Sequence, residues 1–434
     1  MSEVLFEVVA AIVLMALLAV VVLKPRGLPE GFVGLLGAAI LIVIGATTPS
    51  VAFAQAESLM PTVLFLGFCL IFAGLCEREG LFVYCADIIG RLSRGRPGKL
   101  FVLCFLMAAF VTASLSLDTT VLLLTPVILA TAERMRLDYR PYAYAACHLA
   151  NTASLLLPVS NLTNLLAMQN TGLDFLDFVV MMALPWLAAV GTEFAVLRCG
   201  FGTMLSSRHY DASDSGRLQT TGNRSADDNA PKDDEHVPLL AIVVVGMTLA
   251  GFMISGKLGL SPFWFAAFGC IALTIGRAAA GRASAREQLL QAWNDANPSF
   301  LLFVLALAVV VAALSGNGLG NLIAPLFSMG TSLPVLLLVA GVAALSANVL
   351  NNLTAAMLLI PLAASHGLIM VMAILIGVNI GPNLTYAGSL ATILWRRTLQ
   401  ERGRRVELAR FTAIGLISVP LCIIAATVTL WLLA

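Results

Sequence analysis

Apolar stretches of membrane-spanning length recur along the whole 434-residue chain, for example at 4–23, 237–255 and 411–432. A helix needs about 20 predominantly apolar residues to cross a bilayer. The first stretch has no small-residue cleavage site and more spans follow it, so we expect a retained helix and not a signal peptide. The pattern predicts an all-α polytopic membrane protein.

Two interruptions of this pattern match each other. The segments SLDTTVLLLTP at 116–126 and NNLTAAMLLIP at 351–361 each pass from a short polar run through an apolar run to proline. Each is followed by a second helix-breaking segment, NTASLLLPVSNLTN at 151–164 and NIGPNLTYAGSLAT at 379–392. Helix breaks at corresponding places in two membrane-buried halves point to the substrate site of a transporter.

Composition and charge extend this picture. The chain is 59% hydrophobic and only 11% charged, outside the range of soluble domains. Of its 25 Lys and Arg residues, 24 lie in six clusters and only Lys257 lies elsewhere. The positive-inside rule predicts that all six clusters face the cytoplasm. The clusters are 24–26, 78–99, 134–140, 198–232, 277–286 and 396–410. The loops at 47–58 and 170–177 carry no Lys or Arg and should face outward.

Under this constraint the N-terminus lies outside, and each half has five crossings plus one re-entrant hairpin. The halves then have opposite orientation, as in an inverted repeat. In the first half, 1–206, the crossings are 4–23, 32–48, 61–76, a broken helix at 141–169 and 178–197, with a hairpin at 100–132 whose tip is at 116–120. In the second half, 237–434, they are 237–255, 262–276, 299–315, a broken helix at 367–395 and 411–432, with a hairpin at 333–364 whose tip is near 346–352. The alternative is two ordinary spans in place of each hairpin, which would move basic segments outside.

Three segments are expected to lie outside the bilayer core. The polar segment 207–236 cannot bury enough apolar surface to order itself, and we predict a flexible cytoplasmic linker. Its His209 and His236 have no second ligand pair at metal-site spacing, so no metal site is predicted. The segments 81–94 and 319–330 precede the hairpins and are typical of interfacial amphipathic helices.

The four breaks are rich in neutral hydrogen-bonding side chains, which we predict to bind substrate. One alternative stays open for each of them: these side chains can satisfy one another's broken backbone, because unpaired backbone groups are costly in a bilayer. The predicted substrate-binding residues are Ser116, Thr119, Thr120, Asn151, Ser160, Asn161, Asn164, Asn351, Asn352, Thr354, Asn379, Asn383, Thr385, Ser389 and Thr392.

Asp118 is the one acidic residue that this topology brings near mid-membrane, since Glu7, Asp87 and Glu193 fall near helix ends or on surface helices. An ionisable residue at that depth is a functional-site candidate, and burial suits it to reversible protonation. Asp118 is therefore the predicted proton-coupling residue, with a cation ligand and a helix cap as alternatives. No Lys or Arg lies at the same depth, which argues against strongly anionic substrates.

The remaining reactive side chains are expected to be structural. The eight cysteines are scattered and form no close triad, so we expect them to pack as small apolar side chains and not to ligate metalloid. His148, just before the first break, is either a packed histidine or a proton relay. We expect no catalytic residues, no cofactor and no nucleic-acid partner, and the absence of a phosphate-binding loop means that any use of ATP needs a partner.

The run NIGPNLTYAGSLATILWRRTL at 379–399 resembles the late signature of the arsenical pump membrane proteins, the arsenite permeases, within the wider ion transporter superfamily. LLLTPVILA after the Asp118 tip, NTASLLLPVSNLTNLLA and NVLNNLTAAML resemble the family's other breaks. Leu117 stands where an Asn commonly precedes the Asp, and Asn379 and Asn383 stand where an acid and a lysine occur in some relatives. These departures leave Asp118 as the candidate for carrying a proton.

The resemblance implies a secondary transporter of the bacterial inner membrane that exports arsenite, and also antimonite, in exchange for protons. It also implies an inverted-repeat fold in which a homodimer and a soluble ATPase subunit are possible partners. A small uncharged trihydroxide fits a site of hydroxyl and amide groups. The alternative within the superfamily is sodium or carboxylate transport. A passive channel and a membrane-embedded enzyme are the alternatives from other classes.

Overall fold

The computed structural model describes residues 3–23, 28–206, 237–314 and 325–434, and these residues form helices and no strands. Seven helical stretches are long and apolar enough to cross a membrane. They are α3 (Pro49–Arg78), α5 (Pro97–Ser114), α10 (Phe175–Gly200), α13 (Pro262–Ala279), α14 with α15 (Ala285–Leu314), α17 (Leu333–Leu350) and α21 (Leu408–Leu433). Shorter apolar helices include α1 (Glu3–Leu23), α2 (Glu30–Val43), α12 (Leu239–Ser255), α18 (Asn352–Ala364) and α19 (Leu368–Ile380). The prediction of an all-α polytopic membrane protein is confirmed.

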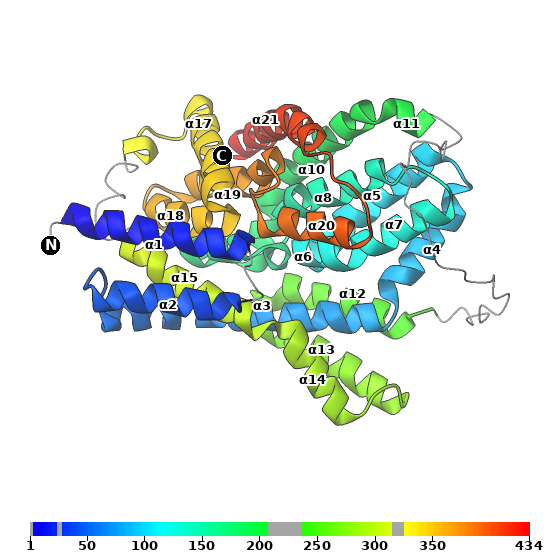
Figure 1. Cartoon of the computed structure of the whole chain (residues 1–434), viewed down its shortest axis with the longest axis horizontal. Helices are drawn as coiled ribbons and strands as arrows, with labels where there is room; N and C mark the ends of the chain where they lie inside the picture. Colours follow the sequence, from blue (N-terminus) through cyan, green and yellow to red (C-terminus); the bar gives the residue numbers. More distant parts are fainter. Residues whose placement is uncertain (1–2, 24–27, 207–236, 315–324) are drawn as a thin grey trace.

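The helices form two layers, which Figure 1 shows one above the other. One layer contains α2, α3, α12, α13 and α15, where α2 packs on α15 and α3 packs on both α13 and α15. The other contains the predicted hairpins, the broken helices and the long pair α10 and α21. Within this second layer α17 and α19 approach so closely that a Cβ atom at Gly377 would collide with the carbonyl oxygen of Ala340. The layers therefore separate the helices of the predicted scaffold from those that carry the breaks.

Both ends of the first predicted hairpin lie against the short helix α4 (Leu81–Ser93). Its first arm, α5, begins four residues after α4 ends. Its second arm ends with α7 (Thr125–Arg134), where Arg134 pairs with Asp87 of α4 at 3.1 Å. The segment thus leaves and returns on one side of the molecule, as a hairpin must. How deep it enters a bilayer stays a prediction.

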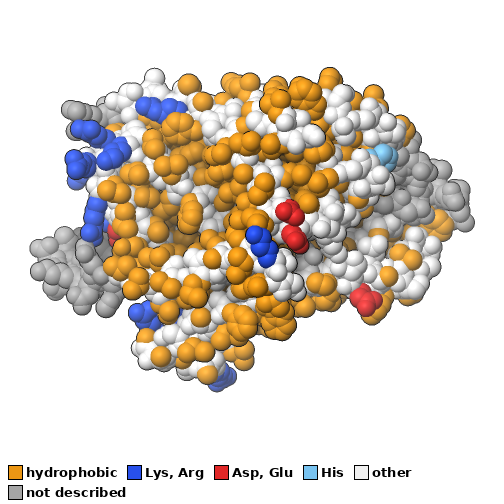
Figure 2. Space-filling view, turned by 180° about the vertical axis from the view of Figure 1, so that it is seen from behind, with side chains coloured by type: hydrophobic (Ala, Val, Ile, Leu, Met, Phe, Trp, Pro, Cys, Tyr) orange, Lys and Arg blue, Asp and Glu red, His pale blue; other side chains and the backbone are white. Residues whose placement is uncertain are grey.

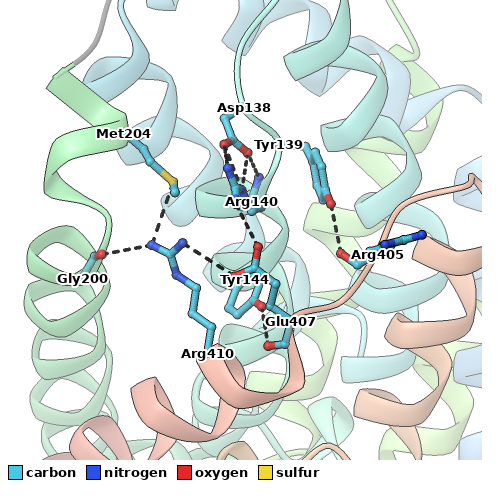
Figure 3. Close-up of polar contacts among 9 residues, drawn as sticks. All are labelled: Asp138, Tyr139, Arg140, Tyr144, Gly200, Met204, Arg405, Glu407 and Arg410. Carbon is cyan, nitrogen blue, oxygen red and sulfur yellow. Dashed lines mark hydrogen bonds and ion pairs between the residues drawn. The ribbon is translucent and has the colours of Figure 1, made fainter. Parts of the chain in front are cut away.

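The Lys and Arg side chains gather at one end of the molecule. Figure 2 shows a largely apolar face on which most Lys and Arg side chains lie toward the left side, with one basic side chain near the centre beside acidic ones. At this end the start of α8 (Arg140–Thr152) contacts the segment before α21, as Figure 3 shows. Arg140 donates to Glu407 at 2.9 Å, and Tyr144 donates to the carbonyl oxygen of Glu407 at 3.1 Å. Arg410 lies 4.6 Å over the Phe201 ring, so the polar cluster ties together segments from both halves.

Two segments differ from the sequence prediction or fall outside it. Residues 285–296 form α14, a helix that the charge pattern did not predict; a capping box at Ser284 and Glu287 starts it. The predicted flexible linker 207–236 lies outside the described residues, as do 319–324 of the predicted interfacial helix 319–330.

Candidate functional site

The first tip is an extended residue between two helices. Ser116 has an extended backbone and interrupts the helical structure after α5. Its hydroxyl accepts a hydrogen bond from the Thr119 backbone N–H at 3.1 Å and so caps α6 (Leu117–Thr119). The next turn is a π-helix, η2 (Thr120–Leu124), directly before α7. Pro126 explains it, because a proline inside a helix has no N–H to donate and its ring clashes with the carbonyl four residues earlier. Asp118 is held half-buried in this irregular arm.

The other three breaks begin their inner helices in the same way. Asn351 caps α18 through its side-chain oxygen, which accepts from the Thr354 backbone at 3.0 Å. Asn161 caps α9 (Leu162–Thr171), and Ser389 caps α20 (Leu390–Glu401) with a capping box. All four caps satisfy backbone donors that a helix end leaves unpaired. The inner half-helices therefore start, with their positive dipole ends, at four polar residues.

These starts converge on a central cavity of about 60 Å³, several times the roughly 10–15 Å³ that one water needs. Its polar lining combines the two tips with the first broken helix. The predicted residues in this lining are Ser116, Asp118, Ser160, Asn161, Asn351 and Asn352. Apolar side chains complete it, among them Leu117, Leu353 and Leu390. No Lys or Arg is among the described residues that line this cavity.

A larger cavity of about 290 Å³ adjoins the central one, and both are lined by Asp118, Phe300 and Leu390. It extends toward the basic end of α3, where it reaches Glu77 and Asp295. A third cavity, of about 560 Å³, lies toward the opposite loops and has no lining residue in common with the central cavity. We call the 290 Å³ cavity the vestibule. Of the cavities among the described residues, it is the one that shares lining residues with the central cavity, and it lies toward the basic side.

Four of the predicted asparagines lie outside the cavity lining and bind one another across the halves. Asn379 accepts from Asn161 at 3.1 Å and donates to Asn164 at 2.7 Å. Asn151 donates to Asn383 at 2.9 Å. Asn151, Asn164, Asn379 and Asn383 are at most 1% exposed. Asn164 and Asn383 also donate to backbone carbonyls, of Leu157 at 2.8 Å and of His148 at 3.0 Å, which matches the alternative left open by the sequence.

The remaining predicted residues divide in the same way. Thr119 lines the 290 Å³ cavity beside Asp118. Thr120 is fully buried and shares a 2.7 Å hydrogen bond with Thr112 of α5. Thr385, Ser389, Thr392 and Thr354 do not line the central cavity; the hydroxyl of Thr385 donates to Asn348 at 2.8 Å, while Ser389 and Thr392 form their capping box. The substrate role of each stays a prediction.

Glu193, which the sequence analysis placed near a helix end or on a surface helix, is fully buried in the structure. It lies on α10, the helix that packs along α21, and its carboxylate is 2.8 Å from Nδ1 of His148. An acidic residue inside an otherwise apolar span was the available signal. Metal ligation has no support among the described residues, where no group of three His, Cys, Asp or Glu side chains could hold an ion.

Comparisons with known proteins agree with this architecture. The family model described as "Citrate transporter" (CitMHS) matches residues 6–377. The arsenical pump membrane protein of Escherichia coli K12 is 26% identical over 413 residues, covering 92% of each chain. That of Yersinia enterocolitica is 27% identical, covering 91% of each. The crystal structure of the Alcanivorax borkumensis YdaH transporter has a TM-score of 0.58 at 14% identity, covering 88% of this chain and 86% of that one, which is a likeness of fold alone.

Proposed function

This chain belongs to the citrate transporter family CitMHS, and we propose that within this family it exports arsenite in exchange for protons. The family match and the seven apolar helices make it a multi-pass membrane transporter, and its relatives place it in the bacterial inner membrane. The similarity to arsenical pump membrane proteins supports a metalloid substrate.

The observation that carries the proposal is the chemistry of the central cavity. Its polar groups are hydroxyls and amides with one carboxylate, Asp118, and no basic side chain is among its lining residues. Arsenite at neutral pH is mostly a small uncharged trihydroxide, which needs hydrogen-bonding partners and no fixed counter-ion. Antimonite has the same hydroxide form and belongs to the same proposal.

A citrate-like substrate is the second candidate, because the family model carries that description. Several carboxylates would have to be bound next to Asp118 without an Arg or Lys, although carboxylate recognition ordinarily uses Arg. The four helix starts supply partial positive charge. The carboxylates of the substrate and of Asp118 would nevertheless repel one another at short distance. The cavity therefore favours a neutral solute over a multiply charged anion.

In the proposed cycle Asp118 takes a proton from outside and releases it inside, and arsenite binds while Asp118 is ionised. The two halves act as an inverted repeat, with the hairpins moving against a scaffold formed by the first three helices of each half. That scaffold also offers a surface for a homodimer. The vestibule on the basic side gives this arrangement an inward-facing access path under the predicted topology.

The test is arsenite uptake into everted membrane vesicles with an imposed pH gradient. We expect Asp118→Asn to lose gradient-driven accumulation, while Asp177→Asn, the same change at an exposed position on α10, retains it. Citrate in place of arsenite tests the second candidate in the same vesicles. Full gradient-driven activity of Asp118→Asn would refute the proton role. Unchanged arsenite sensitivity of an efflux-deficient host on expression would refute the substrate.

The predicted hairpin has a separate test. A cysteine introduced at Arg134, where the first hairpin ends against α4, should react with an impermeant label only from the cytoplasm. Labelling from outside would show that residues 100–132 cross the membrane once and form no hairpin.

A further inference from the structure

A second ionisable site lies away from the cavity, between α8 and α10. His148 and Glu193 are both fully buried, and Nδ1 of His148 lies 2.8 Å from Oε1 of Glu193. The other carboxylate oxygen, Oε2, accepts from the Thr152 hydroxyl at 3.3 Å and from the Cys422 thiol at 3.5 Å. An ionised carboxylate only accepts hydrogen bonds, and all three neighbours can donate. The contacts therefore suit an ionised Glu193.

The second imidazole nitrogen makes the pair sensitive to one proton. Nε2 of His148 is buried and has no hydrogen-bond partner among the described residues. If His148 is neutral, the pair carries an uncompensated negative charge in an apolar interior. If it is protonated, the charges balance but the Nε2–H donor has no acceptor. The neutral state leaves a charge unbalanced and the protonated state leaves a donor without an acceptor. The surrounding contacts therefore fix neither protonation state of His148.

Among the described residues, no Lys or Arg is bonded to the pair, whose side chains contact Thr152, Cys422 and the Phe411 ring. Cys147 of α8 and Cys422 of α21 are the titratable side chains that interact electrostatically with Glu193. The Phe411 ring lies 5.1 Å from the imidazole and also contacts Tyr144. The titratable residue in the buried part of α5 is Cys104, and the turn η7 (Gly381–Leu384) contributes only neutral side chains. The guanidinium of Arg410, at the start of α21, contacts Glu407, Gly200 and Met204 instead.

A continuous set of hydrogen bonds joins the pair to the break of the second half. The side-chain amide of Asn383, in η7, donates to the backbone carbonyl of His148 at 3.0 Å and to the Thr152 hydroxyl at 2.8 Å. That same hydroxyl donates to Glu193. Two hydrogen bonds, through the Thr152 hydroxyl, thus link Glu193 to Asn383, a residue that connects the halves.

We propose that His148 and Glu193 form a second proton-binding site, in which Nε2 of His148 takes up and releases one proton and Thr152 passes the change to Asn383. The proton comes from water and returns to water, and no other bond forms or breaks. The role of this site in transport rests on the proposed proton exchange, whereas proton binding itself does not. Both residues are positioning residues, since neither lines the central cavity.

The first experiment measures proton binding without substrate. His209, His236 and His366 are replaced by Gln, the protein is labelled with ¹⁵N-histidine, and the imidazole nitrogens of His148 are followed by solid-state NMR in proteoliposomes. We expect both neutral and cationic imidazole across the pH range in which the protein stays folded. In Glu193→Gln the transition between them should be displaced toward lower pH, because the carboxylate that stabilises the cationic imidazole is gone. A single protonation state throughout the range, or no displacement in Glu193→Gln, would overturn the proposal.

The second experiment tests the link to transport in Thr152→Val. We expect the NMR transition of His148 to remain while the pH profile of arsenite counterflow changes. Thr192→Val is the matched control, because among the described residues the Thr192 hydroxyl donates to the carbonyl oxygen of Ala188 in its own helix, at 2.7 Å. An unchanged counterflow profile in Thr152→Val would overturn the link. If the protein does not transport arsenite, the proposed function fails while the NMR result still decides proton binding.

Discussion

The cross-half amides predict a separation between stability and transport. Asn379 accepts from Asn161 at 3.1 Å and from Thr163 at 2.6 Å, and it donates to Asn164 at 2.7 Å. Asn379→Leu removes all three hydrogen bonds. Buried polar contacts between membrane helices contribute about 0.6 kcal/mol on average and about 1.7 kcal/mol at most, so the loss is about 2–5 kcal/mol.

This free energy converts to a measurable shift in the melting temperature. At roughly 2.1 cal/mol/K of unfolding entropy per residue, 434 residues give about 0.9 kcal/mol/K. Asn379→Leu should therefore lower the melting temperature by about 2–5 °C. The melting temperature is measured by tryptophan fluorescence of the purified protein.

The matched control is Asn352→Leu, an asparagine that lines the central cavity and is not in the Asn379 cluster. We expect this variant to lose arsenite transport at an unchanged melting temperature. Two results would contradict the reasoning. One is a melting temperature of Asn379→Leu within about 1 °C of the unsubstituted protein. The other is an equal loss of stability in Asn352→Leu.

Two further predictions concern the basic end. Glu79 accepts from Arg277 at 3.1 Å and from Arg282 at 2.8 Å, and Glu79→Gln leaves the buried Arg277 without its anion. We expect the free energy of unfolding to fall by about 3–5 kcal/mol. An unchanged melting temperature would contradict this. Burial raises the pKa of the Cys85 thiol on α4, whereas Cys199 is exposed. Because the thiolate is the reactive form, maleimide should label Cys199 first at pH 7, and Cys85 should react faster as pH rises; mass spectrometry that finds equal rates at pH 7 would refute this.

The helices themselves were predictable from the sequence. Hydrophobic runs and proline positions predicted the break at Asn351 and the broken helix that the structure shows around Pro158. The residue before a proline is disfavoured in the α region, and Leu157 is indeed extended. Helix breaks of this kind depend on residues that are adjacent in the sequence, so they could be predicted without a structure.

The partners of each polar side chain could not be predicted in the same way. Whether Asn379 faces a cavity or another amide depends on how the two halves pack, at sequence separations above 200 residues. From the sequence, Glu193 was placed near a helix end or on a surface helix, and its burial was not predicted. Its burial comes instead from α21, whose packing on α10 no local pattern specifies.

The capping residues also determine where this protein can change during evolution. Ser116, Asn161 and Asn351 cap the starts of helices with the same side chains that line the cavity, so replacing one of them disturbs the backbone as well as the solute contacts. Leu117 and Leu353 line the cavity without capping a helix. Substitutions that alter the range of transported solutes should therefore accumulate at these two positions, while the three caps constrain the fold that a descendant inherits.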